Sequence, residues 1–328
     1  MTLVTGGAGF IGSHVVDELL RMRHRVVVLD DLSGGFQENV NPAATFVGGS
    51  ITDNALIQAL FERHRFEYVF HLAAYAAEGL SHFIKRFNYE NNLIGSVNLI
   101  NAAVNHGTKC FVFSSSIAVY GENQLPMTEA LIPRPEDSYG IAKRAVEEEL
   151  AASRRLFGLD YIIFRPHNVY GERQNIGDKY RNVIGIFMNQ IMQGQPLTVF
   201  GDGTQTRAFS YVADVAPYIA RSIESAAAYG EIFNVGADTP YSINELAEEV
   251  MRAMGVSVPI RYLAERKEVK HAYCSHEKFA EAFPHRDPTP LAEGVRRMAR
   301  WARQAGPRRS QEFADIEITK NLPAAWTS

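Results

Sequence analysis

Three polar residues have the types and the spacing needed for acid–base chemistry on an alcohol. Tyr139 and Lys143 are four residues apart, so on a helix both side chains project from one face. Ser116 ends a serine run that follows a short apolar stretch with strand character. The pKa of a free phenol is about 10, but a neighbouring ammonium favours the phenolate. The three residues therefore predict that Tyr139 takes the proton of a substrate hydroxyl while Ser116 binds the same oxygen.

A glycine-rich loop predicts where an electron acceptor binds. Gly6, Gly9 and Gly12 follow a predicted strand and open a predicted helix. Glycines in this context allow a tight turn, close approach of the backbone to a pyrophosphate and tight packing of helix on strand. The unpaired N–H groups at the start of the helix then face the phosphates. We expect a dinucleotide here, which takes a hydride from carbon as Tyr139 takes the proton. Lys143 would also hold the ribose hydroxyls on the nicotinamide side, and the positive nicotinamide ring would join its ammonium in favouring the phenolate of Tyr139.

Two carboxylates indicate which dinucleotide binds. Asp30 ends the next predicted strand, about twenty residues after the glycine loop. A carboxylate there accepts hydrogen bonds from the adenosine ribose and repels a 2′-phosphate. Asp31 adds to that repulsion, and no arginine follows immediately. The sequence therefore predicts NAD rather than NADP.

The elements that position these residues alternate along the first half of the chain. Short β-branched runs predict strands at 2–5, 25–30, 68–71, 109–114 and 161–165. Helical periodicity predicts helices at 10–21, 54–65, 83–106 and 138–157. This alternation predicts an α/β Rossmann fold, a doubly wound parallel sheet with helices on both faces. Such sheets bind ligands beyond the carboxyl ends of their strands, and Ser116 lies at one of these ends.

The second half predicts a smaller, interleaved substrate-binding lobe. Glycine and proline become frequent after residue 168, and short strands are expected at 197–200 and 232–235. We expect the chain to return to the large sheet near 208–214 and 232–234. The predicted division is a mainly NAD-binding domain at 1–168, completed by about 208–236, and a lobe formed by 169–207 and 237–305. The polar, aperiodic segment 306–328 predicts a loosely packed tail.

Composition narrows the classes of partner. The 328 residues are 46% hydrophobic and 21% charged, with a net charge of −4. No overall basic field favours nucleic acid or an anionic membrane. Cys110 and Cys274 lie far apart without the spacing of a metal site, and so few cysteines suit a reducing compartment. With no apolar run of about 18 residues and no signal peptide, we expect a cytoplasmic protein that binds no metal, nucleic acid or membrane.

Over about residues 2–303 the chain resembles the extended short-chain dehydrogenase/reductase superfamily, and within it the nucleotide-sugar epimerases. The motifs that carry the resemblance are Thr5-Gly-Gly-Ala-Gly-Phe-Ile-Gly12, His71-Leu-Ala-Ala74, Asn91, Ser114-Ser-Ser-Ile-Ala-Val-Tyr-Gly121, Tyr139–Lys143, Arg165-Pro-His-Asn-Val-Tyr-Gly171 and Gly201-Asp-Gly203.

The resemblance implies two sets of binding residues. Those for NAD are Phe10, Ile11, Asp30, Asp31, Ser50, Ile51, Leu72, Ala73, Ala74, Asn91, Ser114, Tyr139, Lys143 and His167, together with the glycine loop. Those for the nucleotide-sugar are Ser116, Asn168, Asn182, Val183, Thr198, Phe200, Arg207, Arg266 and Tyr273. Arg207 and Arg266 would bind the diphosphate with charge-assisted hydrogen bonds.

Residues beside the catalytic serine separate the activities within this superfamily. Ile117 and Ala118 follow Ser116, where related dehydratases and decarboxylases carry an acid and 3,5-epimerases place a cysteine. Neither side chain donates a proton, which favours oxidation, rotation and reduction at C4. Glu78, in a loop that borders the sugar in relatives, disfavours a uronic acid, and Tyr273 in the sugar pocket would crowd an N-acetyl group. Ser50 stands where relatives commonly have an aspartate, Ala76 where some have a lysine, and Ala208 where an aspartate is common.

The resemblance thus implies NAD-dependent 4-epimerisation of a UDP-hexose, most simply UDP-glucose and UDP-galactose, through a transient 4-keto sugar. Alternatives are a 4-epimerase of UDP-glucuronate or a UDP-N-acetylhexosamine, a 4-keto nucleotide-sugar reductase, or a non-catalytic dinucleotide-binding regulator. The long helices predicted at 83–106 and 138–157 would pair across a two-fold axis as a four-helix bundle, so we expect a homodimer.

Overall fold

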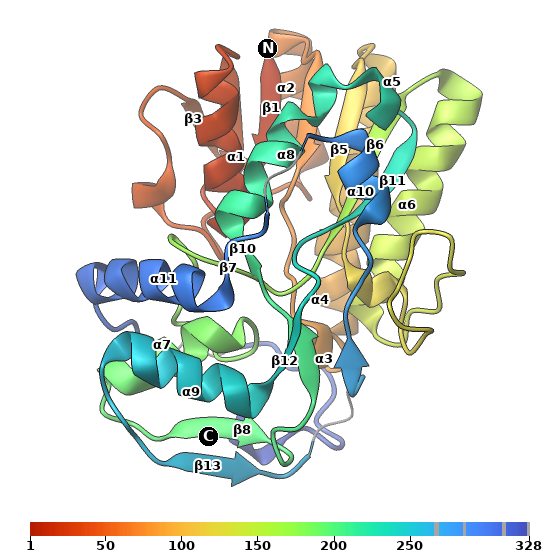
Figure 1. Ribbon diagram of the computed structural model, residues 1–328. Coiled ribbons are helices and arrows are strands. Elements are labelled where there is room, and N and C mark those ends of the chain that lie inside the picture. Colours follow the sequence, from red (N-terminus) through yellow and green to blue (C-terminus); the bar gives the residue numbers. More distant parts are fainter. Residues whose placement is uncertain (266–268, 285–286, 310–312, 327–328) are drawn as a thin grey trace.

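A seven-stranded parallel sheet forms the centre of the larger domain (Figure 1). The computed structural model describes residues 1–328 except 266–268, 285–286, 310–312 and 327–328. In spatial order the strands are β11 (Glu231–Val235), β6 (Asp160–Pro166), β5 (Cys110–Ser114), β4 (Tyr68–His71), β1 (Thr2–Thr5), β2 (Val26–Asp30) and β3 (Thr45–Gly48). All neighbouring strands are parallel. The order reverses between β1 and β4, which confirms the doubly wound Rossmann sheet.

Helices cover both faces of this sheet, as predicted. Successive residues of a strand point to opposite faces, so Leu3 packs in one hydrophobic core and Val4 in the other. On the Val4 side lie α1 (Phe10–Arg21) and α8 (Ala216–Arg221), which pack together. The Leu3 side is covered by α2 (Asn54–His64), α5 (Gly95–Asn105) and α6 (Ser138–Phe157).

The helix predicted at 83–106 is more segmented than its periodicity suggests. It consists of α4 (Lys85–Tyr89), a π-helical turn (Glu90–Ile94) and α5, and the short α3 (Glu78–Ser81) precedes it. Single π-helical turns often lie at functional sites. The sequence analysis also missed β3, a four-residue edge strand whose first and last residues are exposed, so it lacks a buried hydrophobic run.

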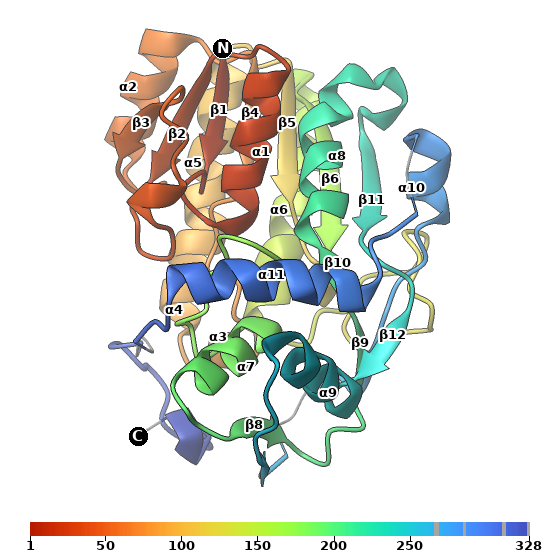
Figure 2. The same ribbon diagram turned by 60° about the vertical axis from the view of Figure 1, so that its left-hand side comes forward.

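The second half forms the smaller lobe shown below the sheet in Figure 2. Its helices are α7 (Val183–Met192), α9 (Ile243–Met254) and α11 (Leu291–Ala305), while α10 (Glu277–Ala282) packs near β11. Its short strands form pairs or triples: β8 (Leu197–Phe200) with β13 (Ile260–Leu263), β9 (Thr206–Ala208) with β12 (Pro240–Ser242) and β14 (His271–Ala272), and β7 (Val169–Tyr170) with β10 (Ser210–Tyr211).

One expected return to the large sheet is wrong and the other is confirmed. Within 208–214 the chain forms β10, which pairs with β7 outside the large sheet. The position beside β6 is instead taken by β11, whose Ile232 pairs with Ile163. β6 already has β5 on one side, so its other side accepts only one strand. Because β11 occupies that side, 208–214 cannot pair with β6.

The tail is also packed more closely than predicted. Trp326, close to the C-terminus, is only 7% exposed and belongs to a hydrophobic cluster with Leu80, Ile84 and Tyr180. Phe313, Ile316 and Leu322 pack against the same cluster. These apolar residues are spread along a mostly irregular segment, so they produce neither helical nor strand periodicity.

Across the described parts of the chain, no helix combines the length and apolar character that a membrane crossing requires. The same parts contain no group of three or more His, Cys, Asp or Glu residues able to hold a metal ion. Cys110 and Cys274 are both buried free thiols.

Candidate active site

The predicted catalytic residues meet where β5 ends and α6 begins. Asp137 caps α6 by accepting a hydrogen bond from the Gly140 N–H at 2.8 Å, which places Tyr139 and Lys143 in the first two turns. The Lys143 ammonium donates to the carbonyl of Ser114 at 2.8 Å and lies 5.6 Å from the centre of the Tyr139 ring. The Ser116 hydroxyl lies close enough to the Tyr139 phenol to favour a lower pKa of that phenol. The structure thus brings the three predicted residues together, all of them buried.

Burial opposes the charged forms of both Tyr139 and Lys143. It raises the pKa of the Tyr139 phenol above its usual value, and the carboxylates of Glu78 and Asp137 raise it further. Burial also lowers the pKa of Lys143 to about 7, although the nearby Glu147 carboxylate opposes that shift. The lowered phenol pKa expected from the sequence is therefore not produced by the protein alone, because desolvation outweighs the charges that favour phenolate.

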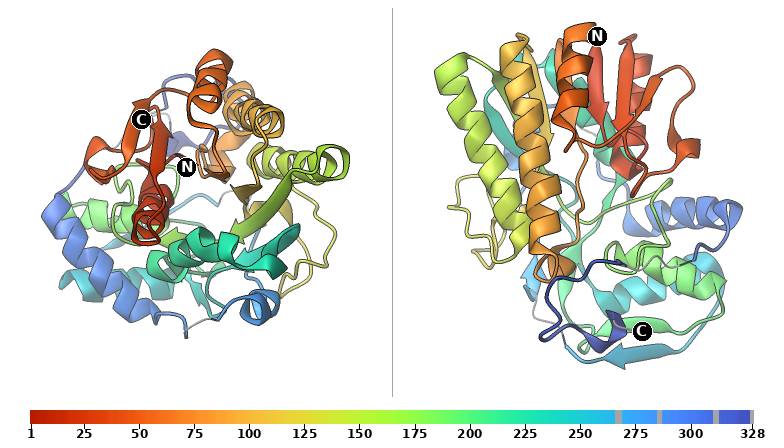
Figure 3. Two further views of the ribbon diagram at one scale, coloured as in Figure 1. Left: turned by 90° about the horizontal axis from the view of Figure 1, so that it is seen from above. Right: turned by 180° about the vertical axis from the view of Figure 1, so that it is seen from behind.

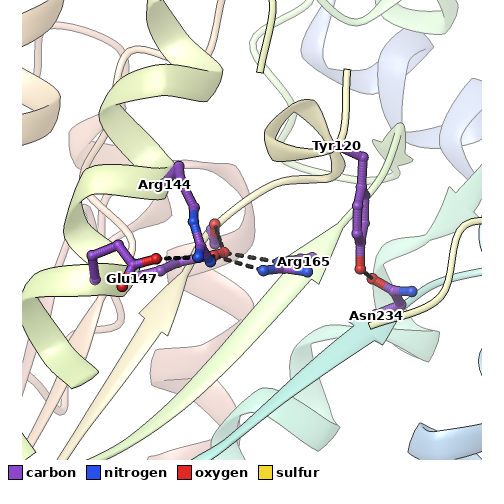
Figure 4. A network of polar contacts seen from close by, with 7 residues as sticks. Tyr120, Arg144, Glu147, Arg165 and Asn234 are labelled. Atoms are coloured by element: carbon purple, nitrogen blue, oxygen red, sulfur yellow. Dashed lines mark hydrogen bonds and ion pairs between the residues drawn. The ribbon is translucent and has the colours of Figure 1, made fainter. Parts of the chain in front are cut away.

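A buried ion pair supports this corner of the site (Figure 4). Glu147 lies one helical turn beyond Lys143 and accepts two hydrogen bonds from the Arg165 guanidinium, at 2.9 and 2.7 Å. The Ser115 hydroxyl donates to the same carboxylate at 2.6 Å, and Arg144 donates to it at 3.0 Å. Glu147 is not among the site residues predicted from the sequence. The available signal was its position four residues after Lys143, on the same face of the helix.

The glycine loop has the shape that a dinucleotide requires. Gly6 has a φ of +70°, and a Cβ atom there would lie 2.6 Å from the backbone nitrogen of Ala73. A Cβ at Gly12 would lie 2.0 Å from the carbonyl oxygen of Gly6. Gly9 is the N-cap residue of α1 and has no side chain, so it does not compete for the N–H groups at the helix start. These positions need glycine, and they fit a pyrophosphate.

Asp30 fastens the end of β2 to this loop. Its carboxylate accepts hydrogen bonds from the N–H groups of Ala8 and Leu32, at 3.0 and 2.8 Å. Asp30 is buried, and this burial raises the pKa of its carboxyl group. Asp31, next to it, is exposed. The pair therefore stands beside the glycine loop, where an adenosine ribose is expected.

The other residues expected to bind NAD follow the carboxyl ends of neighbouring strands or lie on adjacent helices. After the strands come Ser50 and Ile51 (β3), Leu72, Ala73 and Ala74 (β4), and His167 (β6), while Ser114 is the last residue of β5. On the helices, Phe10 and Ile11 begin α1 and Asn91 lies in the π-helical turn. Carboxyl ends of parallel strands share one edge of a sheet, so the fold gathers the residues that follow them. Asn91 donates its amide to the carbonyl of Phe87 at 3.0 Å.

His167 belongs to a polar chain that the sequence analysis did not find. Its Nδ1 lies 3.1 Å from the carbonyl oxygen of Ala208, and its Nε2 lies 3.1 Å from Nε2 of His276. His276 in turn contacts the Asp238 carboxylate at 2.6 Å. Burial lowers the pKa of His167 to about 3. His167 is therefore neutral near neutral pH, and no sequence motif connects it with residues so distant along the chain.

Three of the residues expected to bind the nucleotide-sugar share one cavity. Asn168, Asn182 and Val183 line a space of about 60 Å³ together with Tyr170 and Phe209, among others. A larger space of about 420 Å³, lined by residues such as Glu129, Lys278 and Glu281, includes none of the predicted site residues.

The remaining described residues of the lobe that are expected to contact the nucleotide-sugar lie on or directly after its small sheets. Thr198 and Phe200 are on β8, Arg207 is on β9, and Tyr273 follows β14. The Arg207 guanidinium donates to the carbonyls of Thr206, Val269 and Lys270 at 2.8, 2.6 and 3.0 Å. Arg266 lies outside the described residues, and the diphosphate contacts expected of both arginines stay predictions.

Comparison with known proteins gives the chain its family. The sequence profile of the NAD dependent epimerase/dehydratase family matches residues 2–236. A putative UDP-glucose 4-epimerase of Methanocaldococcus jannaschii is 36% identical over 304 residues, which are 92% of this chain and 98% of that protein. UDP-glucose 4-epimerase of Thermotoga maritima, solved with UDP-glucose, has a TM-score of 0.89 and 36% identity over 93% of this chain and 99% of its own. UDP-glucose 4-epimerase of Thermus thermophilus, solved with NAD, has a TM-score of 0.88 and 32% identity with the same coverage. This chain belongs to the NAD dependent epimerase/dehydratase family.

Proposed function

We propose that this protein is an NAD-dependent 4-epimerase of a UDP-hexose, with UDP-glucose and UDP-galactose as the pair that it interconverts. The observation that carries the proposal is the buried contact of Ser116, Tyr139 and Lys143 at the sheet edge that also holds the glycine loop. The activity named for the similar proteins supports it.

In this proposal each catalytic residue has one task. The glycine loop and Asp30 would hold NAD, which would supply the hydride chemistry at C4 of the sugar, removal from one face and return to the other. Tyr139 takes the proton of the C4 hydroxyl and later gives it back, as a general base and then a general acid. Ser116 donates a hydrogen bond to the same oxygen, and Lys143 supplies positive charge near the phenol. Ala118 is buried and carries no acid, so the site lacks a proton donor for elimination there.

The two domains would divide the binding. Residues 1–168, with the strand that returns within 208–236, would bind NAD through the residues predicted from the family resemblance. Residues 169–207 and 237–305 would bind the nucleotide-sugar, with Asn168 at the boundary. Charge complementarity favours a neutral hexose, because Glu78 lies close enough to Tyr139 to raise the pKa of its phenol and would repel a uronic acid. The alternatives of UDP-glucuronate, a UDP-N-acetylhexosamine and a 4-keto reductase are less well supported, as is a non-catalytic regulator.

The proposed enzyme is a cytoplasmic homodimer. Its free buried thiols suit a reducing compartment. Large apolar side chains are exposed on the outer helices, namely Ile94 in the π-helical turn and Ile141, Leu156 and Phe157 on α6. Figure 3 shows α5 and α6 side by side on one flank of the molecule. Two copies joined through this flank would bury these side chains in a four-helix bundle.

The test is to incubate the purified protein with a panel of UDP-sugars and no added cofactor. The panel contains UDP-glucose, UDP-galactose, UDP-glucuronate and UDP-N-acetylglucosamine, and the products are separated by chromatography. We expect UDP-galactose and UDP-glucose to interconvert, because each turnover regenerates the NAD that copurifies with the protein. A requirement for stoichiometric NADPH, or release of a dehydrated sugar, would contradict the proposal.

A further inference from the structure

The C-terminal residues of this chain form a segment beyond the lobe. The compared epimerases are matched over 98–99% of their own length but only 92–93% of this chain, so part of this chain has no counterpart in them. The resemblance of the sequence ends near residue 303. We call residues 313–326 the C-terminal strap. After α11, the Arg308 carbonyl accepts a hydrogen bond from Asn189 of α7, and the strap lies in the region of α3 and α4 (Figures 2 and 3).

Trp326 fastens the strap to α3. Its ring meets those of Phe83 and Tyr180 edge to face, with centres 6.0 and 5.4 Å away. It also lies over Gly79 in α3, where an added Cβ would be 3.3 Å from the indole. Leu80, the next residue of α3, is fully buried in the same cluster. The indole thus packs directly against α3.

Glu317 fastens the strap to the start of α4. Its carboxylate accepts hydrogen bonds from the backbone N–H groups of Arg86 and Phe87, at 2.8 and 2.9 Å. These are donors of the first helical turn, which lack partners within a helix. The strap backbone adds two more bonds, since the N–H groups of Glu317 and Ile318 donate to the carbonyl of Phe83 at 2.9 and 3.1 Å. A negative charge at this end also suits the helix dipole.

Phe313 adds a third attachment. Its ring centre lies 4.8 Å from that of Phe87 and 5.4 Å from that of Tyr75. Its N–H donates to the Tyr180 hydroxyl at 3.2 Å. The strap therefore joins α3, α4 and the loop before α7, and both α3 and α4 pack against α6.

The elements that the strap holds touch the catalytic helix directly. The N–H of Tyr139 donates to the hydroxyl oxygen of Ser81 in α3 at 3.2 Å. The Asn88 amide in α4 donates to the carbonyl of Ser138 at 2.8 Å. With four residues, α3 is far too short to be stable by itself, so its position depends on tertiary contacts. The start of α4 is the end of a longer helical segment, where the strap supplies partners for the unpaired N–H groups.

We propose that the C-terminal strap is a positioning element of the active site. By clamping α3 and α4 it fixes the first turn of α6, and so holds the Tyr139 phenol against Ser116 and the substrate oxygen. Trp326 and Glu317 are its positioning residues, and neither touches the reacting atoms. The inference rests on the proposed function, because the position of the phenol matters only if the phenol transfers a proton.

The test compares Trp326→Ala with Trp326→Phe, and with Lys320→Ala as a control at an exposed position of the same strap. Turnover of UDP-galactose is measured well below each variant's Tm. Misplacing a catalytic group by about 1 Å lowers turnover by up to a hundredfold, so we expect kcat to fall about ten- to a hundredfold in Trp326→Ala. The affinity for UDP alone should stay near wild type, because the nucleotide is expected to bind the lobe. Phenylalanine should restore most of the loss, since it keeps an aromatic ring over Gly79.

Hydrogen–deuterium exchange gives a readout that does not depend on activity. We expect peptides covering 78–84 and 138–143 to exchange faster in Trp326→Ala and to match wild type in Lys320→Ala. Should Trp326→Ala fail to fold, Glu317→Gln, which weakens the acceptor for the α4 donors, is measured in the same way. Wild-type kcat and unchanged exchange in the folded variant would overturn the proposal. A lowered Tm with normal kcat would also contradict the proposal, because the strap would then stabilise the fold without positioning Tyr139. Inactive wild-type protein would reject the proposed function instead, and the exchange data would still test the clamp.

Discussion

At the scale of single residues, the site is governed by the desolvation of ionisable groups. Tyr139 and Lys143 are both buried, and burial shifts the pKa of each toward its neutral form. Glu147 acts in the other direction on Lys143, since its carboxylate raises the pKa of that ammonium. A catalytic phenolate therefore requires positive charge at the site, and Lys143 with the expected nicotinamide are the candidates. Two predictions follow from this balance.

Replacing Tyr139 with Phe removes the hydroxyl and leaves the ring in place. We expect turnover of UDP-galactose to fall by about 10²–10⁴-fold, the usual contribution of a general acid–base group. The copurified NAD should remain bound, because the glycine loop and Asp30 are untouched. Turnover is measured by chromatography of the products, and NAD by its release on denaturation. Activity close to wild type would show that another group transfers the proton.

Replacing Lys143 with Met should stabilise the protein at acidic pH while abolishing turnover. Burial lowers the pKa of Lys143 from 10.5 to about 7. Below pH 7 the native wild type holds a buried ammonium that unfolding would expose to water, so removing this group raises the free energy of unfolding. The gain should shrink as the pH rises from 7 to 10.5, because the neutral amine then predominates in the native state.

The measurement is thermal unfolding of Lys143→Met and wild type at about pH 6 and about pH 10, the two sides of this window. Lys320→Met, at an exposed position of the tail, is the control and should leave Tm nearly unchanged at both pH values. A Tm difference that grows as the pH rises would mean that the ammonium of Lys143 is stabilised, not destabilised, by its surroundings.

At the scale of elements, one buried carboxylate joins three of them. Glu147 on α6 binds Ser115 after β5 and Arg165 on β6. Arg165 in turn lies 4.7 Å from the ring of Tyr120, whose hydroxyl donates to Asn234 on β11 at 2.8 Å (Figure 4). This network holds the carboxyl ends of neighbouring strands against the catalytic helix. It thereby links the residue next to Ser116 to the helix that carries Lys143.

Breaking this ion pair on one side should be strongly destabilising. We expect Glu147→Gln to lower the free energy of unfolding by about 3–5 kcal/mol, because it leaves Arg165 buried without its counter-charge. Replacing both partners, as Glu147→Leu with Arg165→Met, should recover much of that loss, since no charge is then left buried. Urea unfolding of both variants measures the difference. If the double variant is as unstable as the single one, hydrogen bonds to Ser115 and Arg144 dominate over the ion pair.

At the scale of the whole molecule, α6, the helix that carries Tyr139 and Lys143, has the sheet on one side and an exposed apolar surface on the other. Its inner face packs against the sheet, and its outer face carries the exposed Ile141, Leu156 and Phe157. The lobe and the C-terminal strap meet the same domain at the opposite end of the strands from the N-terminus (Figure 1). The proposed dimer and the strap therefore act on different sides of the same helix, and each can be tested without disturbing the other.

A charge on the outer flank should separate the proposed dimer. We expect the double variant Ile94→Glu and Ile141→Glu to sediment with half the mass of wild type, because a charged carboxylate is not tolerated in an apolar interface. Ile132→Glu is the matched control, since Ile132 is an exposed isoleucine outside the helices and should not alter the mass. Analytical ultracentrifugation makes the comparison. A wild-type protein that sediments as a monomer would contradict the proposed assembly.

The sequence by itself determined the local features of this protein. Periodicity identified β1, α1, β4 and α6, and the glycine pattern and the spacing of Tyr139 and Lys143 marked the expected cofactor and catalytic positions. These features depend on neighbours within one or two turns, which a sequence displays directly. The role of Glu147 and the packing of Trp326 depend on partners far along the chain. Only the tertiary structure decided them, because a buried charge or an isolated aromatic leaves no periodic signal until the fold supplies its partner.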